Sequence, residues 1–260
     1  MMNREAALAQ FTKEQRIDLK LAGYRRETDG SVVRHVSLTA EDGFVSYSAL
    51  TEETADEAIR AQLAYFRGVG QRFEWKAYDY DAPSDLLERL RAHGFDIGEP
   101  EALMVLEAAD GHPLLEGAVP PAVRRIQEPD GIDELVRLEE EVWGASHAEL
   151  GDRLKADLRE RPETTYVYAA YEEGRAVGAA WMYLHEGTSF ASLWGGSTLP
   201  SHRGKGLYTA LLAARAQAAS RAGFKLLTVD ASPMSRPILE RRGFERLAYT
   251  YPCLSPMPER

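Results

Sequence analysis

The clearest structural signals of this chain lie in the stretch LWGGSTLPSHRGKGLYTALLAARAQAASRAG, residues 193–223. Residues 192–199 form a short run with two adjacent glycines, which Pro200 ends. From Leu207 onward, apolar residues recur at helical spacing in an Ala- and Leu-rich stretch, so propensity and periodicity both predict a helix. Gly223 is its expected C-terminal stop. The sequence therefore predicts a strand, a glycine-containing turn and a helix in direct succession.

The turn between strand and helix, SHRGKG at residues 201–206, is basic. Several backbone N–H groups in the first turn of a helix have no partner within the helix, and the positive end of the helix dipole lies there. Arg203 and Lys205 add positive charge beside Gly204 and Gly206. This combination predicts a phosphate or pyrophosphate site. The spacing differs from a Walker loop and from G-x-G-x-x-G, and the alternative interpretation is a basic loop beside an ordinary amphipathic helix.

RGKGLY at residues 203–208, preceded by Thr198-Leu199-Pro200, resembles the acyl-CoA signature R-x-x-G-x-G/A of the GNAT N-acetyltransferases. Tyr208 departs from that pattern, which has Gly or Ala there, and its ring would crowd the pyrophosphate or stack near it. The order of elements expected over residues 123–252 is β-α-α-β-β-β-α-β-α-β. That order also resembles the GNAT order.

The resemblance implies an α/β (α+β) fold with a mixed, mostly antiparallel sheet, splayed central strands and flanking helices, preceded by a smaller GNAT-like domain. It implies acetyl-CoA as the acyl donor, and no metal. Backbone groups of the strand before the turn would hold the pantetheine arm and the thioester carbonyl. The cofactor-binding residues that it implies are Ser197, Thr198, Leu199, Arg203, Gly204, Lys205, Gly206, Leu207, Tyr208 and Ser232.

Two positions of the family's catalytic pattern differ in this chain. Aligned on Gly243-Phe244, Leu239 stands where the family often has a general-acid Tyr, and Ser232 lies at or near the family's Asn. Leu239 cannot donate a proton. Either another group does so, or release of the thiolate is unassisted, so the identities of the general acid and base stay open.

The candidates for acid–base roles are Asp230, Glu186 and Tyr208. Asp230 ends the strand that faces the splay, where it would orient or deprotonate a cationic amine, or else cap a turn. Glu186 is the second candidate base, or else a solvated carboxylate of a hairpin. Tyr208 would place its phenol near the sulfur, or pack against the sheet.

Several further side chains invite a functional role but have a simpler structural interpretation. Tyr249 and Tyr251 alternate on the last strand and would line an acceptor pocket or belong to the core. Cys253 invites an acyl-cysteine mechanism, but no His or Asp is placed to activate it, which favours a buried thiol. His202 is expected to face the phosphate. We interpret Trp143, Trp181 and Trp194 as core aromatics, and Glu139, Glu140 and Glu141 as the solvated face of a helix.

The expected domains are residues 1–110, a Pro- and Gly-rich linker at 111–122, and a GNAT acetyltransferase domain at 123–260. Residues 73–95 repeat the kind of pattern found at residues 224–244: a strand, a Ser/Pro turn, a short helix and a Gly-Phe stop. The first half therefore resembles a degenerate second GNAT domain.

The first half lacks the basic turn. Its counterpart at residues 49–57 is acidic and contains no glycine, and Thr54 with Glu57 predicts a capping box for the helix that follows. Because an acidic turn repels pyrophosphate, we expect this half to bind no acyl-CoA. Its role would be to support the second half by packing, or to shape the acceptor pocket.

Composition limits the function classes. The chain has 260 residues, 44% of them hydrophobic, one cysteine and a formal net charge of -10. The acidity argues against nucleic acid as a partner, and no apolar stretch is long enough to span a membrane. The lone cysteine excludes an internal disulfide, and a cytoplasmic protein is expected. The sequence does not determine the oligomeric state.

The function that these features favour is an acyl-CoA-dependent N-acyltransferase, with acetyl-CoA as donor, acting by direct transfer to an amine. The acceptor would be a small-molecule or peptide amine, whose identity the sequence does not specify. The alternative is a catalytically degenerate module that binds or senses acyl-CoA, which Leu239 favours.

Overall fold

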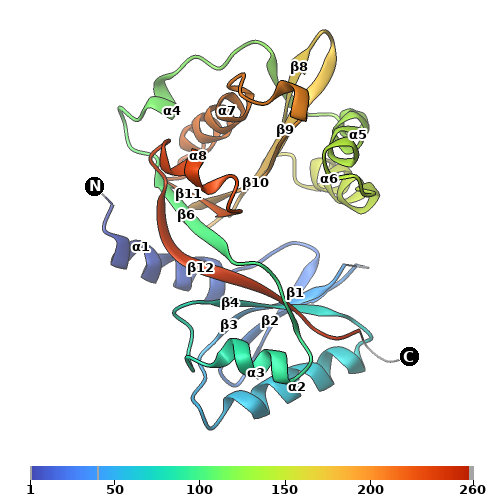
Figure 1. Cartoon of the computed structure of the whole chain (residues 1–260), viewed down its shortest axis with the longest axis vertical. Helices are drawn as coiled ribbons and strands as arrows, with labels where there is room; N and C mark the ends of the chain where they lie inside the picture. Colours follow the sequence, from blue (N-terminus) through green and yellow to red (C-terminus); the bar gives the residue numbers. More distant parts are fainter. Residues whose placement is uncertain (1, 40, 258–260) are drawn as a thin grey trace. The chain divides into compact units, whose positions relative to one another are not determined.

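The computed structural model of the chain describes residues 2–39 and 41–257 (Figure 1). The chain forms two compact units. Unit 1 comprises the chain up to Met104 together with the segment from Asp230 onward, and unit 2 comprises Val105–Val229. The chain passes between the units within β6 (Glu101–Glu107) and within β11 (Leu226–Ala231). These units differ from the consecutive segments 1–110 and 123–260 expected from the sequence, because the C-terminal strand packs with the N-terminal residues.

Unit 1 contains a sheet in the order β1-β2-β3-β4-β12, with β5 also beside β12. The hairpin signal at Asp29-Gly30 is confirmed, since β1 and β2 pair antiparallel on either side of it. The C-terminal strand β12 pairs antiparallel with β4. The elements are α1 (Arg4–Phe11), η1 (Thr12–Ile17), β1 (Tyr24–Asp29), β2 (Val32–Ser37), β3 (Gly43–Ser48), α2 (Ala55–Gly68), β4 (Phe73–Tyr78), α3 (Leu86–Ala92), β5 (Asp96–Ile97), α8 (Arg236–Glu240) and β12 (Glu245–Leu254).

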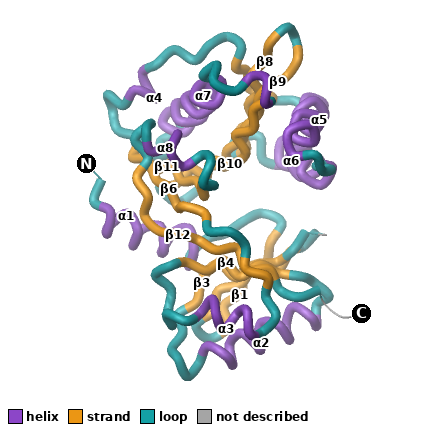
Figure 2. The backbone as a smooth tube through the Cα atoms, in the orientation of Figure 1, coloured by secondary structure: helices purple, strands orange, loops and turns teal. Residues whose placement is uncertain are grey.

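The core of unit 1 lies where α2 and α3 cover one face of its sheet (Figure 2). Ile59 and Phe66 are seven residues apart in α2, so both side chains lie on the same face of the helix. They pack with Phe73 and Trp75 of β4 and with Leu90 of α3, all of them almost fully buried. Burial of such side chains stabilises the fold by about 1.5–3 kcal/mol each.

Unit 2 contains a sheet in the order β11-β10-β9-β8-β7. The pairs from β7 to β10 are antiparallel, whereas β10 and β11 are parallel. The expected mixed, mostly antiparallel sheet with flanking helices is therefore confirmed. The elements are α4 (Pro113–Glu116), β7 (Val123–Ile126), η2 (Pro129–Gly131), α5 (Ile132–Trp143), α6 (Ala148–Glu160), β8 (Thr165–Glu172), β9 (Arg175–Leu184), β10 (Phe190–Thr198), η3 (Pro200–His202) and α7 (Leu207–Arg221).

In unit 2 the helices cover both faces of the sheet, with α7 on one and α5 and α6 on the other (Figures 1 and 2). Apolar residues of α5 at helical spacing, Ile132, Leu135 and Leu138, enter a core with Val167 and Trp181. Among the described residues no helix is long and apolar enough to cross a membrane.

The segment expected as a linker, 111–122, is partly helical. Pro113 opens α4 and the His112 ring accepts a hydrogen bond from the N–H of Leu114 at 3.2 Å, so a proline at the first helical position and a side-chain cap start the helix. Gln217 of α7 donates to the carbonyls of Leu114 and Gly117 at 3.1 and 2.7 Å. The segment is thus held against α7.

Candidate functional site

The central strand of unit 2, β10, contains a bulge at its glycine pair. The register with β9 shifts between Gly195 and Ser197, so Gly196 is an additional residue. The φ angles of Gly195 and Gly196 are +67° and +99°, a backbone conformation that residues with a Cβ rarely adopt. A Cβ on Gly195 would lie 2.4 Å from the Trp181 ring, and one on Gly196 would lie 2.7 Å from the Tyr208 ring. Both positions therefore require glycine.

The parallel pairing of β10 with β11 is short. It extends from Phe190 opposite Leu226 to Ser192 opposite Thr228. Within the described residues, β10 continues to Thr198 without further strand pairing on that side. Beyond Ser192, the carbonyls of Trp194 and Thr198 accept from Arg215 and Arg203, and the strand's other backbone groups on that side have no neighbouring strand to pair with. This is the splay that the resemblance implies.

Ser197, Thr198 and Leu199, at the end of β10, differ in how their backbone groups are hydrogen-bonded. Ser197 and Thr198 pair with β9 on one side only. Leu199, in contrast, donates its N–H to the carbonyl of Val177 at 3.0 Å, and its carbonyl accepts from the N–H of His202 at 2.8 Å. Both backbone groups of Leu199 are therefore already engaged, and its side chain is buried.

The turn after β10 has the conformation of an anion site. Gly204 and Gly206 have φ angles of +78° and +82°, and Gly206 is the N-cap of α7. Glycine has no side chain that could cap the helix, and α7 begins without a side-chain cap. The N–H groups of its first turn are thus available to an external acceptor, at the positive end of a helix that runs to Arg221.

The basic side chains of the turn contact protein groups in this structure. Arg203 donates from Nε to the carbonyl of Thr198 at 3.3 Å. Lys205 Nζ and His202 Nε2 both contact the Glu172 carboxylate, at 2.9 and 2.6 Å. Lys205 holds the pKa of that carboxylate below its ordinary value. His202, expected to face the phosphate, therefore contacts a carboxylate here.

Leu207 and Tyr208 begin α7 on different sides of the backbone. Leu207 packs against the core shared with α5 and α6. The Tyr208 ring lies against the bulge at Gly196, and its burial raises the pKa of its phenol above the ordinary value. Tyr208, where the resemblance expects Gly or Ala, therefore covers the α7 side of the bulge.

A buried arginine supports the bulge from within. Arg215 of α7 is 2% exposed and donates from Nη1 to the carbonyls of Trp194 and Trp181, at 3.0 and 3.3 Å. Its Nε donates to the carbonyl of Leu211 at 3.2 Å. Burial lowers the pKa of Arg215 to about 10. The arginine satisfies carbonyls of β9 and β10 at the irregular register.

The expectation that Glu139 belongs to a solvated helix face is wrong. Glu139 is 2% exposed, and its Oε2 accepts from Ser197 Oγ at 2.7 Å and from Trp143 Nε1 at 2.9 Å. Its neighbours Glu140 and Glu141 are more exposed, as expected. Glu139 follows Leu135 by four residues and so shares the buried face of α5, a spacing that could have identified it.

Two of the three tryptophans expected in the core are exposed. Trp181 is buried, but Trp143 is 61% and Trp194 is 47% exposed. Trp194 Nε1 donates to Ser192 Oγ at 2.8 Å, and Ser192 Oγ lies 2.8 Å from His185 Nε2. Burial lowers the pKa of His185 to about 4, so its imidazole is neutral at physiological pH.

Asp230 and Glu186, the remaining acid–base candidates, and Ser232, a predicted cofactor contact, lie away from the bulge in the chain. Asp230, in unit 1, forms an ion pair with Lys76. Glu186 is exposed in the turn between β9 and β10. Ser232, also in unit 1 and exposed, accepts from the N–H of Ser235 at 3.3 Å, which closes the turn before α8.

Unit 1 has a pocket of about 250 Å³ beside the last strand. Tyr249 and Tyr251 line it together with Arg236. Arg236 Nη1 donates to the Tyr249 hydroxyl at 2.7 Å. Cys253, on the same strand, is fully buried, which raises the pKa of its thiol to about 12.

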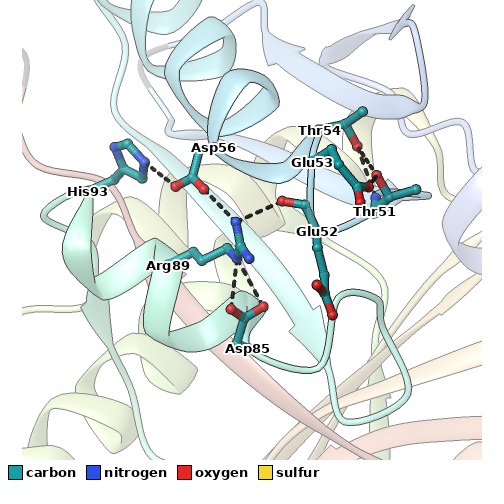
Figure 3. Close-up of polar contacts among 8 residues, drawn as sticks. All are labelled: Thr51, Glu52, Glu53, Thr54, Asp56, Asp85, Arg89 and His93. Carbon is teal, nitrogen blue, oxygen red and sulfur yellow. Dashed lines mark hydrogen bonds and ion pairs between the residues drawn. The ribbon is translucent and has the colours of Figure 1, made fainter.

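The start of α2 in unit 1 is filled by ion pairs (Figure 3). Arg89 donates to Asp56 at 2.5 Å, to the carbonyl of Glu52 at 2.9 Å and to both oxygens of Asp85. His93 Nε2 lies 2.9 Å from the second oxygen of Asp56. Carboxylates of the protein itself therefore surround this helix start, where they would repel a pyrophosphate.

The capping box expected at this helix is wrong. Thr54 is the N-cap of α2 but makes no side-chain bond to the helix. Its hydroxyl instead accepts from the N–H of Thr51 at 2.9 Å, closing the preceding turn. A threonine hydroxyl can serve either acceptor role, and the sequence alone does not distinguish them.

Comparison with known proteins matches residues 132–244 to the family described as Acetyltransferase (GNAT) family. No curated protein matches the chain. Among solved structures, a GCN5-related N-acetyltransferase from Kribbella flavida has a TM-score of 0.66 at 18% identity, over 97% of this chain and 94% of that one. A Staphylococcus epidermidis protein of unknown function has a TM-score of 0.67 at 15% identity, over 94% and 98%.

A tandem GNAT protein from the clavulanic acid biosynthesis pathway is also similar in structure. Its TM-score is 0.59 at 16% identity, and the match covers 94% of this chain and 86% of that one. At such identities the likeness concerns the fold. The likeness extends over nearly the whole chain.

Replacing Arg215 with Met should destabilise the protein by about 3 kcal/mol, because three carbonyls lose a buried, charged donor. Thermal unfolding followed by circular dichroism measures this. Arg221→Met, at the exposed end of the same helix, is the control and should leave the midpoint nearly unchanged. Equal midpoints for the two variants would contradict the assigned role of Arg215.

Cys253 should not react with a thiol reagent in the native protein, because its thiol is fully buried and its pKa is raised to about 12. Absorbance after addition of DTNB measures the reaction. The thiol should become reactive once guanidinium unfolds the chain. Reaction of the native protein at the rate of the unfolded one would show that this thiol is accessible.

Proposed function

We propose that this protein transfers an acyl group from acetyl-CoA to an amine, since residues 132–244 match the model of the GNAT acetyltransferase family. The observation that carries the proposal is the geometry of unit 2. A bulged strand with backbone groups open on one side leads directly into an uncapped helix start with two positive-φ glycines. The strand suits a thioester arm, and the helix start suits a diphosphate.

In this proposal the diphosphate of coenzyme A accepts hydrogen bonds from the N–H groups that follow Gly204 and Gly206. Arg203 and Lys205 turn from Thr198 and Glu172 toward the added negative charge. Arg203 gives up a hydrogen bond to one carbonyl, and Lys205 gives up a solvent-exposed ion pair, so replacing these contacts by bonds to a phosphate is favourable. Glu172 acts against this binding, since its carboxylate repels the phosphate and competes for Lys205.

The acyl carbonyl would lie against the open side of β10, near Ser197 and Thr198. A neutral amine attacks the carbonyl carbon, a backbone N–H stabilises the oxyanion, and the thiolate departs. Transfer is direct, since the one cysteine of the chain is buried and its pKa is raised. The acceptor would be a small-molecule or peptide amine.

The competing function is a module that binds acyl-CoA without turnover. Leu239, at the position where the family often has a general-acid Tyr, is 1% exposed and carries no proton donor. Proton supply to the thiolate must then come from elsewhere. A thiol is a fair leaving group near neutral pH, so the absence of this donor lowers the rate without abolishing the reaction.

Charge reversal at Arg203 should weaken binding of coenzyme A by about tenfold or more, because a charge-assisted bond is replaced by repulsion. Isothermal titration calorimetry measures it. Arg221→Glu makes the same charge change at the far end of α7 and should leave the affinity within about twofold of wild type. The proposal fails if wild type shows no affinity for any coenzyme A species, or if the two variants behave alike.

Glu172→Gln should tighten binding of coenzyme A, because the carboxylate that pairs with Lys205 and His202 is removed. The gain should shrink as salt is added, since these groups are exposed and screened. The same calorimetric titration at low and high salt tests this. An unchanged or weaker affinity at low salt would contradict the position assigned to the diphosphate.

A further inference from the structure

Two exposed tryptophan rings lie on unit 2, each held by its own indole N–H. Trp143 donates to Glu139 at 2.9 Å and to Ser197 at 3.2 Å, and Trp194 donates to Ser192 at 2.8 Å. The rings are nevertheless 61% and 47% exposed. A large ring that is held in place by its own hydrogen bond and left in contact with water offers an apolar surface against which a ligand can pack.

Trp194 and Ser197, the hydrogen-bond partner of Trp143 of α5, lie on the same face of the sheet. Trp194 lies directly opposite Trp181 in the register with β9, and residues paired across strands share a face. Trp181 packs in the core beneath α5 and α6. After the extra residue Gly196, Ser197 returns to this face and reaches Glu139 of α5. Ser192 and Ser197, one on each side of the bulge, thus accept the hydrogen bonds of Trp194 and Trp143.

The donor and acceptor roles around Ser197 are determined by the indole. An indole N–H can only donate, so Ser197 Oγ accepts from Trp143 and its own proton points to Glu139, 2.7 Å away. A hydroxyl has a second acceptor position, and no described contact uses it. An incoming N–H group can therefore donate to Ser197 Oγ.

The Glu139 carboxylate has an oxygen that is free to accept a proton. Its Oε1 is buried and has no hydrogen-bond partner, and within residues 2–39 and 41–257 the carboxylate forms no ion pair. Burial raises the pKa of Glu139 above its ordinary value, while Ser197, Trp143 and the nearby His147 act in the opposite direction. A buried, unpaired carboxylate costs stability, which is typical of a functional group.

We propose that the acceptor is a primary ammonium on an apolar group that lies against Trp143 and Trp194, and that Ser197 and Glu139 form its proton relay. This proposal rests on the acyl transfer proposed above. The ammonium gives a proton to Ser197 Oγ as the Ser197 proton passes to Glu139 Oε2. The resulting neutral amine attacks the thioester carbon. As the C–S bond breaks, the second N–H proton goes to the departing thiolate, and Glu139 later releases its proton to water.

The activity test uses acetyl-CoA with benzylamine as the probe acceptor, and compares wild type with Glu139→Gln and Glu141→Gln. Glu141 lies on the same helix, is exposed and pairs with Arg175, which makes it the matched control. Wild-type kcat/KM should fall as pH falls through the raised pKa of Glu139, since the carboxylate must be ionised to accept the proton. Glu139→Gln should lose this acid limb and about 100-fold in kcat, with unchanged affinity for coenzyme A.

Binding of the amine is measured separately by tryptophan fluorescence in the presence of coenzyme A. Benzylamine should quench saturably, benzyl alcohol should bind more weakly, and Trp143→Ala should reduce the response. Absence of quenching in wild type, or equal binding of the alcohol, overturns the assigned acceptor class.

A stability measurement tests Glu139 without any acceptor. A carboxylate whose folded-state pKa is raised favours folding while protonated, and this contribution is lost as pH rises through the folded pKa. The unfolding midpoint of Glu139→Gln should therefore rise relative to wild type as pH increases above the ordinary pKa of a glutamate, about 4.3. A constant difference would show that Glu139 has no raised pKa and would overturn the relay.

The remaining outcomes separate the two proposals. If wild type binds coenzyme A but Glu139→Gln and Glu141→Gln share one pH profile, only the relay is overturned. If His185→Asn, rather than Glu139→Gln, removes the acid limb, the proton passes to the Ser192–His185 pair and the relay is likewise wrong. If wild type binds no coenzyme A, the acyl transfer itself fails.

Discussion

The structure of unit 2 depends on the bulge at Gly195 and Gly196. One extra residue in β10 changes which backbone groups pair with β9 and which face away from it. Two positive φ angles and two neighbouring rings leave room only for glycine. Arg215 satisfies carbonyls of both strands at this point from a fully buried position. A cationic donor held beneath an irregular strand makes the irregularity a fixed feature of the fold.

The bulge also separates two chemical environments. On the side of α7, Tyr208 covers Gly196 and the uncapped helix start follows a few residues later. On the side of α5, Ser197 contacts Glu139 and Trp143. An acyl donor on one side and an amine on the other would meet at the open backbone of β10. A single backbone irregularity would thus define both halves of a two-substrate site.

The sequence predicts those parts of the structure whose conformation depends on neighbouring residues alone. The helix after Gly206, the hairpin at Asp29-Gly30 and the basic turn follow from propensity, turn chemistry and dipole arguments. Glu139 was not found because three consecutive glutamates indicate a solvated face, although helical spacing from Leu135 places the first of them inside. The exposed tryptophans were missed because ring size favours burial, whereas hydrogen bonds to distant side chains decide their positions. The packing of the C-terminal strand with the N-terminal residues is a long-range pairing that no local pattern encodes.

A crystal structure of the protein grown with coenzyme A would locate the bound molecule. We expect one molecule, with its diphosphate within hydrogen-bond distance of the N–H groups at the start of α7 and its pantetheine arm beside β10 after Ser192. We expect no molecule at the start of α2, where Arg89 and its carboxylates lie. Coenzyme A bound elsewhere, or an empty turn at saturating concentration, would contradict the proposed function.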